Sequence, residues 1–137
     1  MEKALTVRPL SSVPPECADA LRAAMSQYDT SGGLLTLGEV LSGSTLCEVC
    51  EGDRPVMWFA VKSNQHATSN EAEVVAAAGA APFDLTRSVL PWIESAVSDQ
   101  ADALTIYTRR PGMRRKLERL GYRVDAFVMR KTLRVQS

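Results

Sequence analysis

Hydrophobic residues recur along this 137-residue chain with two different spacings, and the two spacings separate helices from strands. Apolar positions three and four residues apart form one face of a helix, whereas alternation or a short continuous apolar run is typical of a strand. Start and stop residues support the helices: Thr36 and Glu39 fit a capping box, and Pro111 and Gly121 fit the two ends of a late helix. The predicted helices cover about residues 14–31, 37–42, from Asp84 or Ser88 to 98, and 111–120.

Strands occupy much of the remaining sequence. The run Met57–Val61 is almost wholly apolar, which predicts a central strand covered on both faces. The preceding Glu51-Gly52-Asp53-Arg54 has the chemistry of a hairpin turn. Tyr122–Leu133 is β-rich and predicts a long last strand. The six predicted strands cover residues 5–7, 45–51, 55–62, 71–77, 104–108 and 122–133.

The order of these elements, β-α-α-β-β-β-α-β-α-β, predicts an α/β fold built on a mixed sheet of about six strands. A helix between the strands near residues 75 and 106 implies a right-handed crossover and a parallel pair. Hairpins join the earlier strands, so helices should cover both faces of the sheet. The length of 137 residues fits one domain over the whole chain.

Charge and cysteine content exclude several classes of function. Sixteen basic and sixteen acidic residues cancel, so no overall field attracts nucleic acid or a membrane. The sequence has no apolar run near the ~20 residues that span a bilayer and no signal peptide, which predicts a soluble, cytoplasmic protein. Three cysteines argue against a disulfide framework, and Cys47 and Cys50 should point to opposite faces of one strand. With one histidine, His66, no familiar metal site is predicted.

One basic cluster stands out in this neutral chain. It lies at the start of, and along, the predicted helix after Pro111, and it has two interpretations. These side chains could contact the phosphates of coenzyme A, nucleic acid or an acidic protein surface; alternatively they form the solvated face of an amphipathic helix. A stacking platform for single-stranded nucleic acid is not evident, because only 6% of residues are aromatic. The cluster comprises Arg109, Arg110, Arg114, Arg115 and Arg119.

The end of this helix, Leu117-Glu118-Arg119-Leu120-Gly121-Tyr122, resembles a signature of the GNAT acetyltransferase superfamily. The order of elements resembles that family over nearly the whole chain, whereas the likeness in sequence lies mainly within residues 103–122. The resemblance implies a GNAT-like fold, acetyl-CoA as the acyl donor and an amine as the acceptor. It also implies a glutamate base on the fourth strand, for which Glu71 and Glu73 are the candidates.

Two departures from the family pattern concern the residues that the chemistry uses most. The family binds pyrophosphate with a Gly-x-Gly/Ala loop before a helix, whereas residues 79–88 lack that motif and contain Pro82 and Asp84. Leu117 occupies the place of the family's usual tyrosine acid, and leucine cannot protonate a leaving thiolate. The remaining candidates for pyrophosphate contacts are Thr86, Arg87 and Ser88.

Two functional hypotheses therefore stand. The favoured one is a non-catalytic protein on a GNAT scaffold that acts in assembly or partner binding, because the two departures fall on the residues that the chemistry most needs. Short GNAT-like chains of this length also resemble proteins of tailed phages. Such a protein would be found in the virion. The alternative is a divergent N-acetyltransferase that uses acetyl-CoA. A protein partner or self-assembly is expected, and nucleic acid is the less favoured partner.

Overall fold

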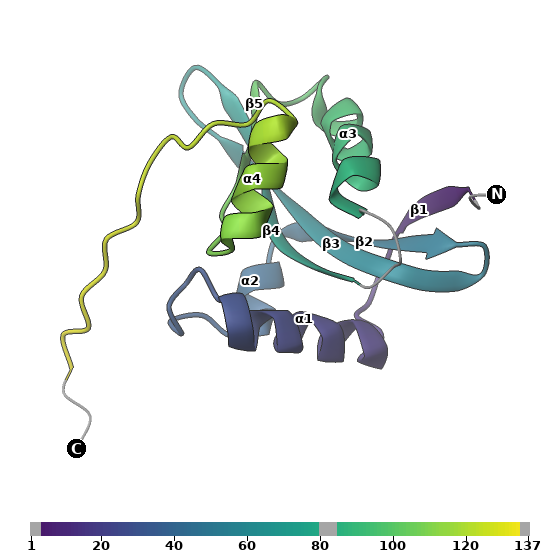
Figure 1. Cartoon of the computed structure of the whole chain (residues 1–137), viewed down its shortest axis with the longest axis horizontal. Coiled ribbons are helices and arrows are strands. Elements are labelled where there is room, and N and C mark those ends of the chain that lie inside the picture. The colour runs from purple at the N-terminus through teal and green to yellow at the C-terminus, as the bar shows by residue number, and fades with distance from the viewer. Residues whose placement is uncertain (1–3, 80–84, 135–137) are drawn as a thin grey trace.

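A computed structural model describes residues 4–79 and 85–134 of the chain (Figure 1). It contains one mixed sheet in which β5 lies beside β4 at one edge. All neighbouring strands are antiparallel except β4 and β5, which are parallel, as the crossover helix between them predicts. The elements are β1 (Leu5–Pro9), α1 (Pro15–Tyr28), α2 (Leu37–Leu41), β2 (Ser44–Glu51), β3 (Arg54–Gln65), β4 (Asn70–Gly79), α3 (Leu85–Val97), β5 (Ala103–Ile106) and α4 (Pro111–Arg119).

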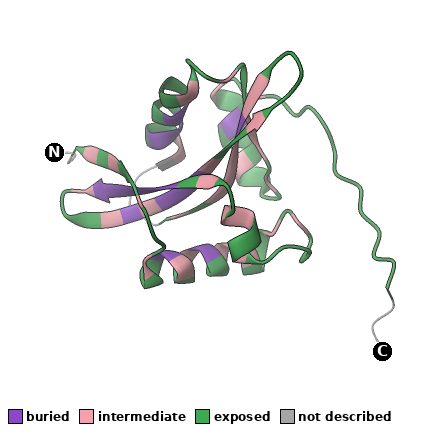
Figure 2. Ribbon diagram, turned by 180° about the vertical axis from the view of Figure 1, so that it is seen from behind, coloured by how far each residue is buried: buried purple, intermediate pink, exposed green. Residues whose placement is uncertain are grey.

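Helices cover both faces of the sheet: α1 and α2 lie on one face, α3 and α4 on the other (Figure 1). Each face has its own apolar core, and the buried residues line the centre of the sheet (Figure 2). On the α1 side, Cys17 and Leu21 pack with Trp58 and Ala60. On the α3 and α4 side the buried residues are Cys47, Val49, Val56, Phe59, Val89, Leu90, Ile93 and Leu117.

Several local predictions are confirmed. The Thr36 hydroxyl accepts a hydrogen bond from the Glu39 N–H, and the Glu39 carboxylate accepts one from the Thr36 N–H, which completes the capping box. Gly52, in the β2–β3 hairpin, has a φ of 63°. Cys47 and Cys50 are free thiols. Cys47 lies in the core beneath α3 and α4, whereas the Cys50 thiol donates to Glu48 on the opposite side of β2.

A buried carboxylate ties the first three strands together. The side chain of Glu48 on β2 is 3% exposed and accepts hydrogen bonds from Arg8 Nη2 on β1 at 2.7 Å and from Trp58 Nε1 on β3 at 3.0 Å. Burial alone raises the pKa of a carboxyl group, but the hydrogen bonds from Trp58, Arg8 and Cys50 outweigh burial and hold the pKa of Glu48 below its usual value.

Two irregularities in the strand register shape the sheet. The pairing of β3 with β2 skips Val56, and the pairing of β4 with β3 skips Val75, so each strand carries one extra residue at these points. Gly79 lies at the end of β4, opposite Met57. A Cβ atom on Gly79 would lie 2.6 Å from the Val56 carbonyl oxygen, so the close approach of these strands requires glycine.

The prediction of a last strand over Tyr122–Leu133 is wrong in this structure. Residues 122–134 form neither helix nor strand (Figure 1). The segment leaves the end of α4 and extends along one side of the molecule, where Arg130 donates to the Thr30 carbonyl. A strand requires a neighbour for its main-chain hydrogen bonds, and this segment pairs with no strand of the described residues. The described sheet therefore has five strands rather than six.

Other boundaries differ less. The β3 strand extends to Gln65, so part of the predicted polar loop belongs to it. The α3 helix includes Leu85, which places Pro91 inside the helix and rules out Ser88 as its start. The alternative cap, Asp84, lies outside the described residues. Within the described ranges, no helix combines the length and the apolar character that a membrane crossing requires.

Candidate active site where β4 and β5 diverge

The candidate site begins where the parallel pair β4–β5 ends. The two strands pair over Glu71–Val74 and Ala103–Ile106 and no further. At the next residue, Val75, the extra residue in β4 changes the course of that strand relative to β3. The β4 strand continues to Gly79, whereas the chain after β5 proceeds towards α4. The main chain of β4 beyond Val74 thus lacks a strand on its β5 side.

A cleft of about 520 Å³ lies at this divergence. Both sides of the sheet contribute to it, because its lining includes residues of α1 as well as residues of α3 and α4. Residues of β4 and those that follow β5 line it, together with residues of α1 and the segment after it, of α2, β3, α3 and α4, and of the C-terminal segment. The lining includes Tyr28, Asp29, Ser31, Leu35, Glu73, Val74, Val75, Ala76, Ala77, Thr86, Tyr107, Thr108, Arg109, Met113 and Leu117.

The first turn of α3 contributes one of the three predicted phosphate contacts. Thr86 lines the cleft, and its hydroxyl lies 3.7 Å from the sulfur of Met113 on α4. Arg87 and Ser88 are exposed and are not among the described residues that line the cleft. The structure therefore brings Thr86, and not its two neighbours, to the candidate site. The segment 80–84, where the family's phosphate loop would fall, lies outside the described residues.

The two candidate bases have different surroundings. Glu73 lines the cleft and accepts a hydrogen bond from Asn64 Nδ2 at 3.1 Å. Glu71 lies on the same face of β4 but outside this cleft, where it accepts hydrogen bonds from the Thr105 hydroxyl and Asn64 and lies 3.5 Å from His66 Nε2. The Thr105 hydrogen bond is the main cause that lowers the pKa of Glu71. Of the two glutamates, Glu73 is therefore the one that lines the cleft.

Leu117, which the resemblance assigns to the acid position on the last helix, is among the residues that line the cleft. It is 6% exposed and contributes to the core beneath α4 as well as to the cleft wall. Tyr122 does not replace the missing phenol, because its hydroxyl donates to Glu94 on α3 at 2.7 Å. Burial and this hydrogen bond raise the pKa of Tyr122. Two other phenols, Tyr28 and Tyr107, line the cleft from the α1 side and from the end of β5.

The basic cluster divides into two groups. Arg109 donates to the Asp29 carbonyl at 3.1 Å, and the guanidinium of Arg110 lies 4.7 Å from the centre of the Tyr28 ring; both residues line the cleft. On α4 itself Arg114 pairs with Glu118 at 3.3 Å. Arg115 and Arg119 are exposed and lie outside the lining of the cleft. The structure therefore does not gather the five arginines into one site.

The sequence analysis missed the segment after α1 as part of the site. Asp29 accepts hydrogen bonds from the Ser31 N–H and hydroxyl and from the Gly33 N–H, which folds residues 29–33 into a compact turn beside the cleft. Asp29 followed two residues later by Ser31 was the available signal. Which strand end this turn would face depends on the tertiary fold.

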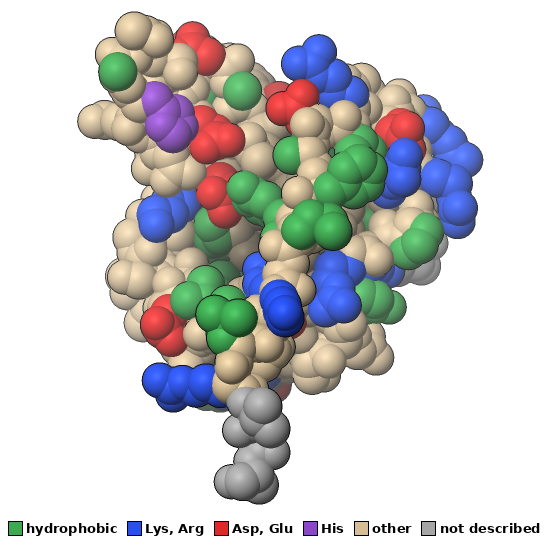
Figure 3. All heavy atoms as spheres, turned by 90° about the vertical axis from the view of Figure 1, so that its left-hand side faces the viewer, with side chains coloured by type: hydrophobic (Ala, Val, Ile, Leu, Met, Phe, Trp, Pro, Cys, Tyr) green, Lys and Arg blue, Asp and Glu red, His purple; other side chains and the backbone are tan. Residues whose placement is uncertain are grey.

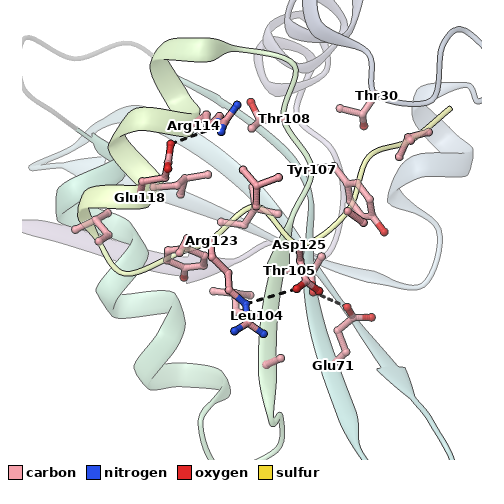
Figure 4. Close-up of a pocket in the computed structure, with 18 of the residues that line it drawn as sticks. Thr30, Glu71, Leu104, Thr105, Tyr107, Thr108, Arg114, Glu118, Arg123 and Asp125 are labelled. Atoms are coloured by element: carbon pink, nitrogen blue, oxygen red, sulfur yellow. Dashed lines mark hydrogen bonds and ion pairs between the residues drawn. The ribbon is translucent and has the colours of Figure 1, made fainter.

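A second cavity lies on the other side of β5. It has a volume of about 1230 Å³ and is bordered by β5, α4 and the segment after α4 (Figure 4). Thr105 and Glu71 face it from the sheet, and Arg123 and Asp125 face it from the C-terminal segment (Figure 4).

No protein-family model and no curated protein matches the sequence. The fold is similar to many solved structures. One is a transcriptional regulator from Bacillus halodurans C-125 (TM-score 0.69, 16% identity), with 95% of this chain and 100% of the other covered. Another is a ribosomal-protein-alanine N-acetyltransferase from Brucella melitensis biovar Abortus 2308 (TM-score 0.66, 15% identity), with 93% and 99% covered. A third is glucosamine-6-phosphate N-acetyltransferase from Arabidopsis thaliana (TM-score 0.59, 11% identity), with 96% and 100% covered. Likeness at this level of identity establishes the fold.

Proposed function

We propose that this chain, which has the fold of the GNAT acetyltransferases, binds acetyl-CoA in the cleft between β4 and β5 and transfers its acetyl group to an amine. The observation that carries the proposal is the divergence of the two strands, which opens a lined cleft beside a free edge of β4. Two of the similar structures are N-acetyltransferases by name, and their acceptors are amino groups.

The cleft suits a long, narrow donor. The pantetheine arm of coenzyme A carries two amides, which can pair with main-chain groups of β4 beyond Val74 as a neighbouring strand would. Val75, Ala76 and Ala77 present small or medium side chains there, so the arm can approach the strand. Thr86 in the first turn of α3 marks the end of the cleft towards which the phosphates would extend.

The acceptor amine would enter from the α1 side, where Glu73 lies. The amine nitrogen attacks the thioester carbonyl carbon, Glu73 takes the proton from that nitrogen directly or through water, and the carbon–sulfur bond breaks. Coenzyme A leaves as a thiolate, which takes its proton from water because Leu117 offers none. This chemistry predicts slow turnover in comparison with an enzyme that has an acid on α4.

The test is a thermal shift with acetyl-CoA, followed by an assay of transfer to a panel of amines. At a hundredfold excess over Kd, ligand binding stabilises the fold by about 2.7 kcal/mol, a rise in Tm of several degrees. ADP, which lacks the pantetheine arm, is the control ligand and should give a smaller shift. Absence of any shift at millimolar acetyl-CoA would refute the proposal.

Paired glutamine variants then locate the base. Glu73→Gln should retain the acetyl-CoA shift and lose at least about tenfold in transfer rate, because a positioned base contributes roughly 10²–10⁴-fold. Glu71→Gln is the matched control on the same face of β4, outside the cleft, and should retain transfer. Equal losses in the two variants would argue against Glu73 as the base.

The second candidate function is the assembly role that the sequence favours. Leu117 in the acid position and the exposed apolar side chains after α4 support it. A place in a phage particle remains a prediction. Recovery of the protein in fixed stoichiometry within a larger particle, together with absence of binding to acetyl-CoA, would favour it over the transferase.

A further inference from the structure

The β5 strand has an open edge. It is the last strand in the described sheet and pairs only with β4. Its other edge faces the cavity of about 1230 Å³ rather than another strand. An unpaired edge presents main-chain donors and acceptors to any extended segment that can reach it, and proteins usually cover or charge such edges.

The C-terminal segment 122–134 has the properties of a strand without a partner. Its sequence is rich in β-branched, aromatic and other apolar residues, yet these side chains are largely in contact with solvent (Figure 2). In the space-filling view the segment crosses the face of the molecule as a line of apolar and basic side chains (Figure 3). The exposed fractions are 43% for Val124, 80% for Phe127, 60% for Val128, 89% for Met129 and 87% for Leu133.

Two contacts hold this segment at a distance from β5. Near its start, the Tyr122 hydroxyl donates to Glu94 on α3 at 2.7 Å. Further along, Arg130 Nη2 donates to the Thr30 carbonyl at 3.2 Å, beside the turn that follows α1. Between these contacts the segment and β5 form opposite walls of the cavity (Figure 4). The cavity between them lies beside the open edge of β5, where a further strand would pair.

We propose that the missing strand is the C-terminal segment of a second copy of this chain. Each copy has one open β5 edge and one unpaired segment. If each copy inserts its segment beside the β5 edge of the other, both edges and both segments gain main-chain hydrogen bonds, and the result is an isologous dimer with two-fold symmetry. The strands across the interface would run β5, the partner's segment, the chain's own segment, and the partner's β5. The Arg130–Thr30 contact means that the chain's own segment runs in the same direction as its own β5. With that direction, every neighbouring pair of strands in the order given is antiparallel.

Charge supports this orientation. Apart from Asp125, the segment is apolar from Val124 to Met129, and it is basic beyond Met129, with Arg130, Lys131 and Arg134. A segment antiparallel to β5 ends beside the start of that strand, where Glu71 and Asp102 lie at the cavity. The basic end of one copy therefore meets the acidic end of the other copy's cavity.

Light scattering coupled to size exclusion tests the assembly with the intact chain. We expect a mass of twice the 14.9 kDa of one chain at micromolar concentration. An inserted strand has neighbours on both sides, so every one of its N–H groups is paired and a proline removes one wherever it falls. Val128→Pro should raise the dimer dissociation constant by at least about tenfold. Val128→Thr, which remains β-branched, is the control and should leave it within about threefold.

A cross-linking experiment identifies which copy supplies the strand. Tyr107→Cys and Ala126→Cys chains, one carrying a size tag, are mixed and treated with a short thiol cross-linker. We expect a mixed-size covalent dimer that Val128→Pro in the Ala126→Cys chain abolishes. The proposal would be overturned if the wild-type protein had the mass of one chain at all concentrations. It would also be overturned if the cross-link formed only within a chain carrying both cysteines, because the segment would then fold onto its own β5.

Discussion

At the scale of single residues, Leu117 is the side chain that distinguishes a cleft that only binds acetyl-CoA from one that also supplies an acid for acetyl transfer. It lies in the cleft wall and in the core beneath α4 at the same time. Leu117→Tyr would place a phenol beside the proposed thioester. If acetyl-CoA binds there, we expect the acetyl transfer rate to rise by at least about tenfold, since a positioned acid contributes roughly 10²–10⁴-fold.

The matched control for this variant is Leu117→Phe, which adds the same ring without the hydroxyl. Both variants enlarge a buried side chain and should lower the free energy of unfolding by about 1–3 kcal/mol. The effect of the hydroxyl group is therefore measured by comparing the transfer rates of Leu117→Tyr and Leu117→Phe with each other, and not with the wild type. Equal rates in the two variants would show that this position does not supply an acid.

Glu48 is the residue whose protonation should be coupled to folding. Its pKa is lower in the folded chain than in the unfolded chain, so its carboxylate contributes stability above the unfolded value of about 4.3, and that contribution is lost as the pH falls through the folded value. Glu48→Gln should lower the free energy of unfolding by about 1–3 kcal/mol at pH 7. The difference from wild type should shrink in urea titrations below pH 4.

Glu51→Gln is a control on the same strand. Glu51 pairs with Arg54 at 3.5 Å across the hairpin, and Arg54 is largely exposed, so its loss should change the free energy of unfolding by no more than about 1 kcal/mol. A difference for Glu48→Gln that stays constant from pH 7 to pH 3 would contradict the linkage.

At the scale of elements, Gly79 governs how closely β4 approaches the bulge in β3. A methyl group there would meet the Val56 carbonyl at 2.6 Å and Met57 Cβ at 2.8 Å. Gly79→Ala should therefore lower the free energy of unfolding by about 1–3 kcal/mol. Gly112→Ala, in α4 with no atom within 4 Å of the new methyl, should instead raise it by about 0.4–1 kcal/mol. Chemical denaturation measures both, and equal effects would contradict the close approach.

Sequence patterns predicted those elements whose signals are local. Thr36 and Glu39 specify the start of α2 through their own side chains, and the hairpin at Gly52 needs only a turn. The segment 122–133 has the composition of a strand, but whether it becomes one depends on a partner edge that no local pattern encodes. The bulge at Val75 in β4 was likewise not predictable from the sequence, because Val74 and Val75 are equally good strand residues.

At the scale of the whole molecule, charge is balanced and the arginines are dispersed. Arg109 and Arg110 contact the region at the end of α1, whereas Arg115 and Arg119 face solvent from α4. We therefore expect no binding of a single-stranded oligonucleotide at about 0.15 M salt, measured by fluorescence anisotropy. Affinity that falls steeply with salt and with the Arg115→Ala/Arg119→Ala double variant would contradict this expectation and restore the nucleic-acid alternative.

The candidate site illustrates what the whole fold adds to the sequence. The likeness in element order directed attention to β4, α3 and α4, and the structure places Thr86, Glu73 and Leu117 from these elements in the lining of one cleft. That Glu73 lines the cleft and Glu71 does not was not predictable, because alternation assigns both to one face. Only the point at which β5 departs from β4 separates them.

The buried Glu48 also has a consequence for how the sheet chooses its alignment. In the native register Glu48 lies opposite Arg8 on β1 and Trp58 on β3, and all three side chains meet on one face. A slip of β2 by a single residue would turn the carboxylate towards the apolar core beneath α3 and α4, away from its partners. Misaligned forms of the N-terminal sheet would thus carry an unpaired buried charge, so Glu48 favours the native register of β2 over its neighbours in free energy.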